Sequence, residues 1–245
     1  MGQSCLAGAI SRFMRLTDRE HRLLRDASEE SRPLSAGQSV VSQGSPITSL
    51  YVLTEGWAVV RSQPVRGRSS IVRIHLPGEI VGLSELAFPT APHAIQMQTD
   101  GHISGLSRDA LAPILKASPR LSALLAGIAS IEQISLRDQC AALGLMPAED
   151  RLIQFFLDLQ GRLGPETAQG SSARILVPFS QAEIGEAVGM TPVYVNKLLR
   201  KLSMEGRINV DRPYVTLNNF RTMQAQIGFT NRYGQVDQSW FPEAA

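Results

Sequence analysis

Cysteine is scarce in this 245-residue sequence, which contains only Cys5 and Cys140. Neither has a second cysteine at CxxC spacing, so the sequence cannot support a disulfide framework or a CxxC redox motif. Histidine is scarce too: the four histidines, at positions 21, 75, 93 and 102, are dispersed and form no HxH pair. A metal-dependent, cupin-like oxygenase or isomerase needs such clusters. We therefore expect no metal ion and no cofactor.

The common catalytic motifs are missing as well. The sequence has no GxSxG elbow, no P-loop and no GxGxxG fingerprint, so it predicts no catalytic residues. It contains no run of eighteen apolar residues, and we expect no membrane span. Residues 1–13 are too short and too weakly apolar for a signal peptide, and Leu6 breaks the myristoylation pattern. These absences predict a cytoplasmic protein that is not an enzyme.

The rest of the composition is that of a globular protein with one large or two modest domains, since 43% of residues are hydrophobic and 19% are charged. Residues 32–107 alternate short β-rich runs with glycines, which indicates an antiparallel, jelly-roll-like barrel. A short charged helix is expected before it, at 17–30. The predicted fold is α+β, with a barrel domain at 1–117, a long helix at 118–144, a winged helix-turn-helix at 147–223 and a tail at 224–245.

The winged helix-turn-helix is predicted from residues 179–202, FSQAEIGEAVGMTPVYVNKLLRKL. Ser180 and Glu183 have the spacing of a capping box. Gly189 suits a left-handed C-cap, and the Thr191-Pro192 pair suits the start of a second helix. Such a second helix normally lies in the DNA major groove. Two β-rich runs within 204–217, around an Asp-Arg-Pro turn, add the wing.

The predicted second helix buries an apolar stripe and turns a mostly polar, basic face outward. On this face we predict DNA contacts at Thr191, Pro192, Val193, Tyr194, Asn196, Lys197, Arg200 and Lys201. Between residues 191 and 207, four basic side chains stand against a single acidic one. This local surplus matters more than the whole-chain net charge of +2, because attraction to phosphates is a local surface effect.

These residues carry a resemblance to a known family. The run SQAEIGEAVGMTPVYVNKLLRKLSMEGRI resembles the DNA-binding end of the cAMP receptor protein/FNR (Crp/Fnr) family of bacterial transcription regulators. The runs GQSVVSQGSPITSLYVLTEGWAVV and LPGEIVGLSEL resemble its effector-binding barrel, and the similarity spans residues 15 to 222. The resemblance implies a homodimer that binds a pseudo-palindrome in double-stranded DNA, with RNA polymerase as a further partner if it activates genes. The N-terminal cysteine cluster of iron–sulfur members is missing.

The resemblance also suggests how bases are recognised. Family members commonly place a glutamate near the start of the second helix and an arginine one turn later, where this chain has Val193 and Lys197. We expect Lys197 to donate to guanine, Asn196 to pair with adenine, and Val193 to pack on a thymine methyl. Thr191, Arg200 and Lys201 are expected at phosphates. The alternative for Lys197 is a phosphate contact.

The long helix at 118–144 carries leucines and isoleucines at spacings of three and four residues. Because a single helix-turn-helix contacts only one half-site, this stripe predicts a seam for a second copy of the chain. The predicted dimerisation residues are Leu121, Leu124, Leu125, Ile128 and Ile131. The alternative is a helix that packs only on its own barrel.

A candidate effector pocket follows from the resemblance. It comprises Arg73, Gly82, Leu83, Ser84, Glu85, His93 and Ala94. Cyclic-nucleotide members hold the ribose with a glutamate and the phosphate with an Arg-Ser or Arg-Thr pair, where this chain has Leu83 and His93-Ala94. Burying the phosphate without those partners is costly, so we do not expect cyclic-nucleotide binding. The alternatives are a barrel that responds to a cyclic nucleotide or another small molecule, a protein-interaction module, and a cupin-like enzyme.

Overall fold

The computed structural model describes residues 5–62, 69–234 and 236–243, and the chain forms two compact units. The N-terminal unit comprises residues 1–63, 72–132 and 236–245, and the C-terminal unit comprises residues 64–71 and 133–235. The long helix α4 (Pro119–Leu145) contributes to both. The boundary between the units therefore falls inside α4, and not at the predicted break at 144–147.

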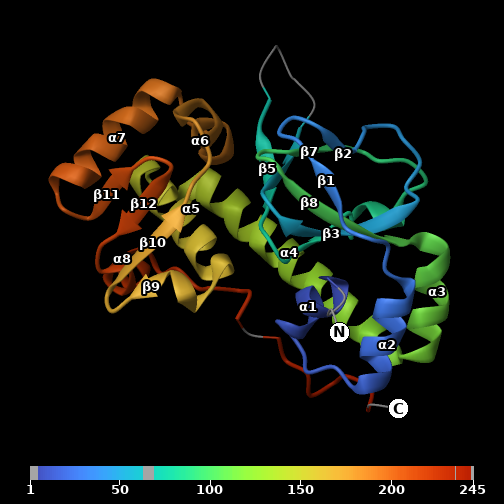
Figure 1. The fold of residues 1–245 in the computed structure, drawn as a ribbon. Helices are drawn as coiled ribbons and strands as arrows, with labels where there is room; N and C mark the ends of the chain where they lie inside the picture. The colour runs from blue at the N-terminus through green and yellow to red at the C-terminus, as the bar shows by residue number, and fades with distance from the viewer. Residues whose placement is uncertain (1–4, 63–68, 235, 244–245) are drawn as a thin grey trace. The chain divides into compact units, whose positions relative to one another are not determined.

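The strands described in the N-terminal unit form two four-stranded sheets (Figure 1). One sheet has the order β1 (Arg32–Leu34), β8 (Gly101–Ser107), β3 (Ser49–Glu55) and β6 (Ile80–Val81). The other has the order β2 (Ser39–Val41), β7 (Ala94–Met97), β4 (Ala58–Arg61) and β5 (Ile71–His75). Leu53 and Ile103 from the first sheet and Ile95 from the second are fully buried in one core. The predicted jelly-roll-like fold is confirmed, although the sheets do not close into a barrel.

Three helices pack beside these sheets around the first turns of α4 (Figure 1): α1 (Cys5–Ser11), α2 (Asp18–Ala27) and α3 (Arg108–Ala117). Thr17 caps α2 and completes a capping box with Glu20. Glu20 is 3% exposed, and its carboxylate accepts hydrogen bonds from Ser118 Oγ at 2.8 Å and Arg120 Nη1 at 3.2 Å. This buried carboxylate therefore ties α2 to the start of α4.

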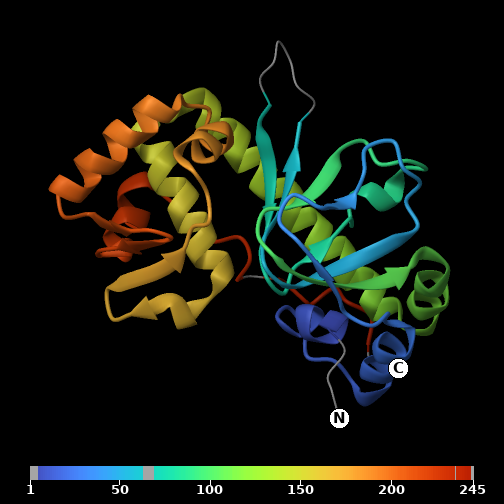
Figure 2. The same ribbon diagram turned by 45° about the horizontal axis from the view of Figure 1, so that its top comes forward.

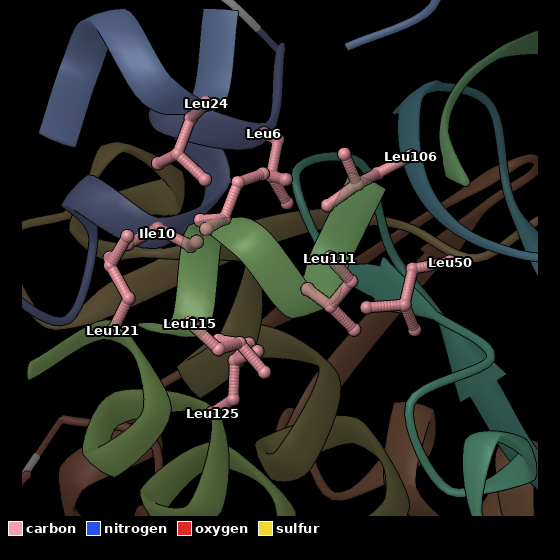
Figure 3. A pocket seen from close by; sticks show the side chains of 10 residues that line it. Leu6, Ile10, Leu24, Leu50, Leu106, Leu111, Leu115, Leu121 and Leu125 are labelled. Atoms are coloured by element: carbon pink, nitrogen blue, oxygen red, sulfur yellow. The ribbon is translucent and has the colours of Figure 1, made fainter. Parts of the chain in front are cut away.

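A small cavity lies where these helices meet β3 and β8, and the side chains around it converge in Figure 3. Its lining is entirely apolar: Leu6, Ile10, Leu24, Leu50, Leu106, Leu111, Ile114, Leu115, Leu121 and Leu125. The cavity volume is about 10 Å³, the space of a single water molecule, which would find no polar partner there. We conclude that it is a dry packing gap and not an effector site.

Helix α4 is buried on the face that was predicted to meet a second copy. Leu121, Leu124 and Ile128 are 1%, 0% and 5% exposed within the chain's own N-terminal core. Leu125 packs against the same core, and Ile131 is half-buried. Leu121, Leu124 and Ile128 are therefore already covered by α1, α2 and α3 in the single chain, so these contacts do not favour the predicted seam, which stays a prediction.

A neighbouring face of α4 carries a second stripe, which we call the exposed α4 stripe. Its members repeat at alternating spacings of three and four residues: Ala126, Ala129, Gln133, Leu136, Cys140 and Leu143. Ala129 is half-buried and the others are exposed, with Leu136 at 50% and Leu143 at 43%.

Among the described residues, no single helix could cross a membrane by length and composition; α3 and α4 together could, but they are bent by 118°.

The C-terminal unit has the predicted winged helix-turn-helix fold. Its described helices are α5 (Ala148–Leu163), α6 (Gln181–Val188), α7 (Pro192–Met204) and α8 (Phe220–Ile227), with a 3₁₀ turn at Pro165–Thr167. Its sheet has the order β11 (Ile208–Asp211), β12 (Tyr214–Leu217), β10 (Ser172–Leu176) and β9 (Ala168–Gln169). Strands β11 and β12 pair antiparallel directly after α7 and form the wing.

The segment predicted as a tail, residues 224–245, is anchored along much of its described length. Helix α8 runs to Ile227, inside the predicted tail. Arg232 forms an ion pair with Asp138 of α4 at 2.8 Å in the C-terminal unit. In the N-terminal unit, Phe241 packs against the helical core, and Trp240 contacts its ring edge-on at a centroid distance of 4.8 Å. The described part of this segment is therefore held by contacts within each unit.

Candidate nucleic-acid interface

Helix α6 begins and ends as its sequence predicts. The backbone N–H of Glu183 donates to Ser180 Oγ at 3.2 Å, and the Ser180 N–H donates to Glu183 Oε2 at 2.8 Å. Gly189 ends the helix in the left-handed conformation, with φ 67° and ψ 44°. A Cβ on Gly185 would lie 2.5 Å from the carbonyl oxygen of Met190, so only glycine allows the following turn to pass so close. These contacts set how α7 leaves the turn.

Helix α7 also starts where predicted, with Thr191 Oγ1 accepting from the Tyr194 N–H at 3.3 Å and Pro192 in the first position. Val195, Leu198, Leu199 and Leu202 are buried against the rest of the unit. The eight predicted DNA contacts lie on the other side, where Asn196 is half-buried and the remaining seven are exposed. Val193 is 81% exposed. Their contact with DNA stays a prediction.

The exposed cationic side chains of α7 differ in whether they already form an ion pair within the protein. Lys197 Nζ lies 6.0 Å from the centroid of the Tyr194 ring. Arg200 is exposed, and no hydrogen bond or ion pair to another described residue involves its guanidinium. Helix α7 runs along the outer edge of the C-terminal unit in Figure 1 and Figure 2. Lys197 and Arg200 are thus able to meet an anion without first breaking an ion pair.

Lys201 is different, because its ammonium is already paired with Glu149 of α5 and lies 3.6 Å from Glu205. Arg207 Nη1 donates to the other oxygen of Glu149 at 2.7 Å. The Lys201 hydrogen bond, together with the charges of Lys201 and Arg207, lowers the pKa of Glu149. Lys201 lies on the predicted face, but much of its charge is compensated within the protein. No sequence pattern predicts the involvement of Glu149, which is 52 residues away from Lys201.

The lowered pKa of Glu149 predicts a pH dependence of stability. A carboxylate with a depressed folded-state pKa stabilises the fold above its unfolded pKa, near 4.5, and loses this contribution as the pH falls through the folded value. Glu149→Gln should therefore lower the melting temperature at pH 7 by a few degrees, and the difference from the parent should shrink below pH 4. Melts followed by circular dichroism across this range test it.

Glu205→Gln is the matched control, since Glu205 approaches the same two cations only at 3.6 and 3.8 Å. It should shift the melting temperature less than Glu149→Gln. A difference between Glu149→Gln and the parent that stays constant from pH 7 to pH 3 would contradict the assignment.

The predicted effector residues contain a single permanent cation, Arg73, and it is paired. Arg73 Nη2 lies 3.1 Å from Glu132 Oε1 of α4 and 3.6 Å from Glu79 Oε2, with all three side chains less than 20% exposed. Neither carboxylate was a predicted site residue, and nothing in the sequence spacing could have revealed them. The positive charge of Arg73 is therefore already compensated by two carboxylates. An anionic ligand would need an uncompensated positive charge at this place.

The other predicted effector residues offer little to a ligand anion. Gly82 has φ +90°, and Leu83 turns toward the helical core. Ser84 is exposed, Glu85 is 8% exposed at the start of a 3₁₀ turn (Glu85–Ala87), and His93 and Ala94 are half-buried. Within the described ranges, no three His, Cys, Asp or Glu side chains are grouped to hold a metal ion. The role of these residues as a pocket stays a prediction.

Comparison with known proteins agrees with this geometry. Residues 31–118 match the model of the cyclic nucleotide-binding domain, and residues 150–225 match the model of the Crp-like helix-turn-helix domain. Together the two matches span more than half of the chain. The second match covers α5 from Asp150 onward, α6, α7 and the wing, which are the elements that position the candidate interface.

Relatives align over nearly the whole length. The chain is 26% identical to the "Anaerobic regulatory protein" of Aggregatibacter actinomycetemcomitans, over 94% of this chain and 88% of the relative. It is 24% identical to the "Fumarate and nitrate reduction regulatory protein" of Salmonella typhimurium, over 93% and 90%. Among solved structures, FixK2 from Bradyrhizobium japonicum matches with a TM-score of 0.71 at 20% identity, over 80% of this chain and 96% of that one.

The two domain matches, their order along the chain and the full-length relatives agree with one another. Regulators of this kind bind DNA and act as dimers, and they are not enzymes. The chain belongs to the Crp/Fnr family of DNA-binding transcription regulators.

Proposed function

We propose that the protein acts in the bacterial cytoplasm as a homodimer that binds a pseudo-palindromic operator through α7 and joins its two copies along the exposed α4 stripe. The observation that carries this proposal is the outward face of α7. Seven of its eight predicted DNA contacts are exposed, and Lys197 and Arg200 make no ion pair with any described residue. If the regulator activates genes, RNA polymerase is the proposed further partner.

Lys197 is the proposed base reader of α7. It lies on the second turn of the helix and is exposed, and lysine can donate to guanine O6 and N7. Lys197→Ala should weaken binding to the preferred operator by about 1–3 kcal/mol and relax the preference at one position of each half-site. Binding measured over a randomised operator library tests this directly.

Arg200→Ala is the matched control, because Arg200 lies about one turn further along the same face and is the proposed phosphate contact. It should weaken all sequences alike and reduce the slope of log affinity against log salt by about one. If Lys197→Ala also weakens every sequence equally, Lys197 is a phosphate contact and another residue reads the base.

The exposed α4 stripe is the proposed dimer seam. Its members alternate at spacings of three and four residues, the pattern by which two helices pack side by side in a coiled coil. In a parallel pair, Leu136 would face its own copy, and Ala126 and Ala129 would let the helices approach closely. Two recognition helices in such a dimer should meet half-sites centred about 10–11 base pairs apart.

The N-terminal unit is proposed to work without a cyclic nucleotide. Arg73 is neutralised by Glu79 and Glu132, and Leu83 and His93 stand at the positions of the ribose and phosphate partners. Millimolar cAMP or cGMP should therefore change neither the melting temperature nor the affinity for DNA. Ligand at 100 times its dissociation constant would stabilise the fold by about 2.7 kcal/mol, which a melt detects easily. A reproducible rise in melting temperature would contradict this proposal.

A further inference from the structure

Three consecutive residues beyond α8, which we call the clamp, contact two different helices of the C-terminal unit. They are Asn231, Arg232 and Tyr233. Arg232 Nε donates to Asp138 Oδ2 of α4 at 2.8 Å. Asn231 Nδ2 donates to the carbonyl oxygen of Gly161 in α5 at 3.1 Å. Two neighbours in the chain therefore join α4 to α5.

The side chain of Asn231 is held by two backbone groups, which fix the orientation of its amide. Its Oδ1 accepts from the Tyr233 N–H at 3.0 Å, while its NH₂ group donates to Gly161. Exchanging the oxygen and the nitrogen would break both bonds. A Cβ on Gly161 would lie 2.9 Å from Asn231 Cγ. The clamp thus reaches α5 at a glycine, a residue that is less favourable than alanine within a helix.

Arg162, the next residue of α5, adds a third contact. Its guanidinium carbon lies 5.2 Å from the centroid of the Tyr233 ring, and its Nη1 donates to Asp158 at 2.9 Å. Arg162 is 3% exposed, so the ring covers a buried cation. The contact with α4 is more accessible, since the side chains of Arg232 and Asp138 are 43% and 41% exposed. Substitutions at the α4 contact should therefore leave the core intact.

The clamp joins α4 and α5 far from their direct connection, which consists of residues 146–147. Asp138 lies seven residues before the end of α4, and Gly161 lies thirteen residues after the start of α5. These points are about 10 Å and about 20 Å along the two helices from the connection. Holding them together fixes the angle between α5 and the C-terminal half of α4. Because α5 packs against α6 and α7, the clamp also fixes where α7 lies relative to that half of α4.

We infer that the clamp is a positioning device, which sets the half-site spacing that the dimer accepts. This inference rests on the proposed function, in which two copies join along α4 and each binds one half-site with α7. Asp138 lies two residues after Leu136, about 200° around the helix, so the clamp leaves the exposed α4 stripe free. Its residues act on operator choice through the placement of α7, without contact with the DNA.

The test removes the contact with α4 in Arg232→Ala. Affinity is measured for operators whose half-sites are moved apart one base pair at a time, which turns the second half-site by about 35° per step. The parent should prefer one spacing and lose a factor of about 100 or more at the others, because the second half-site is then out of reach. Arg232→Ala should bind its best spacing about tenfold more weakly and the neighbouring spacings nearly as well.

Gly161→Ala releases the clamp from α5 in a different way. The added Cβ displaces the Asn231 side chain, yet alanine favours the helix, so α5 should not become less stable. This variant should widen the spacing preference as Arg232→Ala does. Arg232→Asp and Asp138→Arg should each widen it as well. The double variant should restore the narrow preference of the parent, because the ion pair forms again with its charges exchanged.

Arg221→Ala is the matched control, since it removes the same charge from an exposed position of α8. It should leave the spacing preference unchanged, and all clamp variants should bind an isolated half-site as tightly as the parent. The inference is overturned if Arg232→Ala and Gly161→Ala keep the parent's preference, or if the exchanged pair stays as broad as its single variants.

A loss of isolated half-site affinity as large as the loss for the full operator would also overturn it, because the clamp would then only support the fold around α7. The proposed function stands in each of these cases. If the parent binds a full operator no more tightly than an isolated half-site, the proposed dimeric function itself fails.

Discussion

Replacement of Leu136 by aspartate is expected to turn the dimer into a monomer that keeps its fold. Leu136 is 50% exposed in the single chain, so the carboxylate costs the monomer little. In the dimer, two aspartates would face each other in the seam without compensating cations, which opposes association. Light scattering after size exclusion should show half the parent mass. The affinity for a full operator should fall by a factor of about 100 to 10,000, because each half-site is then bound separately.

Leu145→Asp is the matched control for this change. Leu145 is 85% exposed on the same helix, and it lies nine residues further on, about half a turn away from Leu136 around the axis. That variant should remain dimeric. Cys140 provides a second measurement, because it belongs to the exposed α4 stripe and is an exposed free thiol. An added thiol oxidant should cross-link parent chains in a Cys5→Ser background and should not cross-link Leu136→Asp. An intact Leu136→Asp dimer would exclude this seam.

Aspartate at Ile128, which lies eight residues before Leu136 and about 80° away around the same helix, should have a different effect. Ile128 is 5% exposed in the helical core, so the new carboxylate would be buried without a partner. We expect the N-terminal unit to lose about 4 kcal/mol or more, which approaches the whole stability of many domains. Urea denaturation followed by tryptophan fluorescence reports on this unit, since Trp57 and Trp240 both belong to it.

Ile128→Val is the conservative comparison, and it should cost about 0.5–1.5 kcal/mol because it removes one buried methylene without adding charge. If Ile128→Asp instead left the urea midpoint unchanged and split the dimer, the seam predicted from the sequence would be correct after all. The two aspartate variants therefore distinguish the two faces of α4 by different measurements.

The parts of the fold that the sequence predicted are those set by neighbours in the chain. The caps at Ser180 and Thr191 and the turn at Gly189 depend on contacts within three or four residues, and all three were confirmed. The glycine-rich strands of the N-terminal unit likewise indicated its jelly-roll-like fold. Such local patterns depend on contacts between neighbours in the chain, so residues far away in the sequence do not alter them.

The predictions that the structure does not favour depend on partners far away in the sequence. Helix α4 has two stripes at similar spacing, and its own residues do not tell which one α1 and α2 will cover. The sequence predicts the seam on the more apolar stripe, with Leu124 and Ile128, but the folded chain buries these side chains against its own helices, because burial of apolar surface drives folding. Similarly, the compensation of Arg73 by Glu132 and of Lys201 by Glu149 joins residues 59 and 52 positions apart.

The docking of Phe241 has a consequence for the order in which the protein is made. Its ring packs in the N-terminal unit, yet the ribosome adds it only after the whole winged helix-turn-helix. A nascent chain that has emerged as far as α4 can assemble the two sheets and the surrounding helices, but the face beside Gly127, which Phe241 approaches, stays open to water. The N-terminal unit is therefore translated first, but its packing is completed only when the C-terminal residues have been made. A fragment that ends after α4 exposes an apolar patch that the full chain covers.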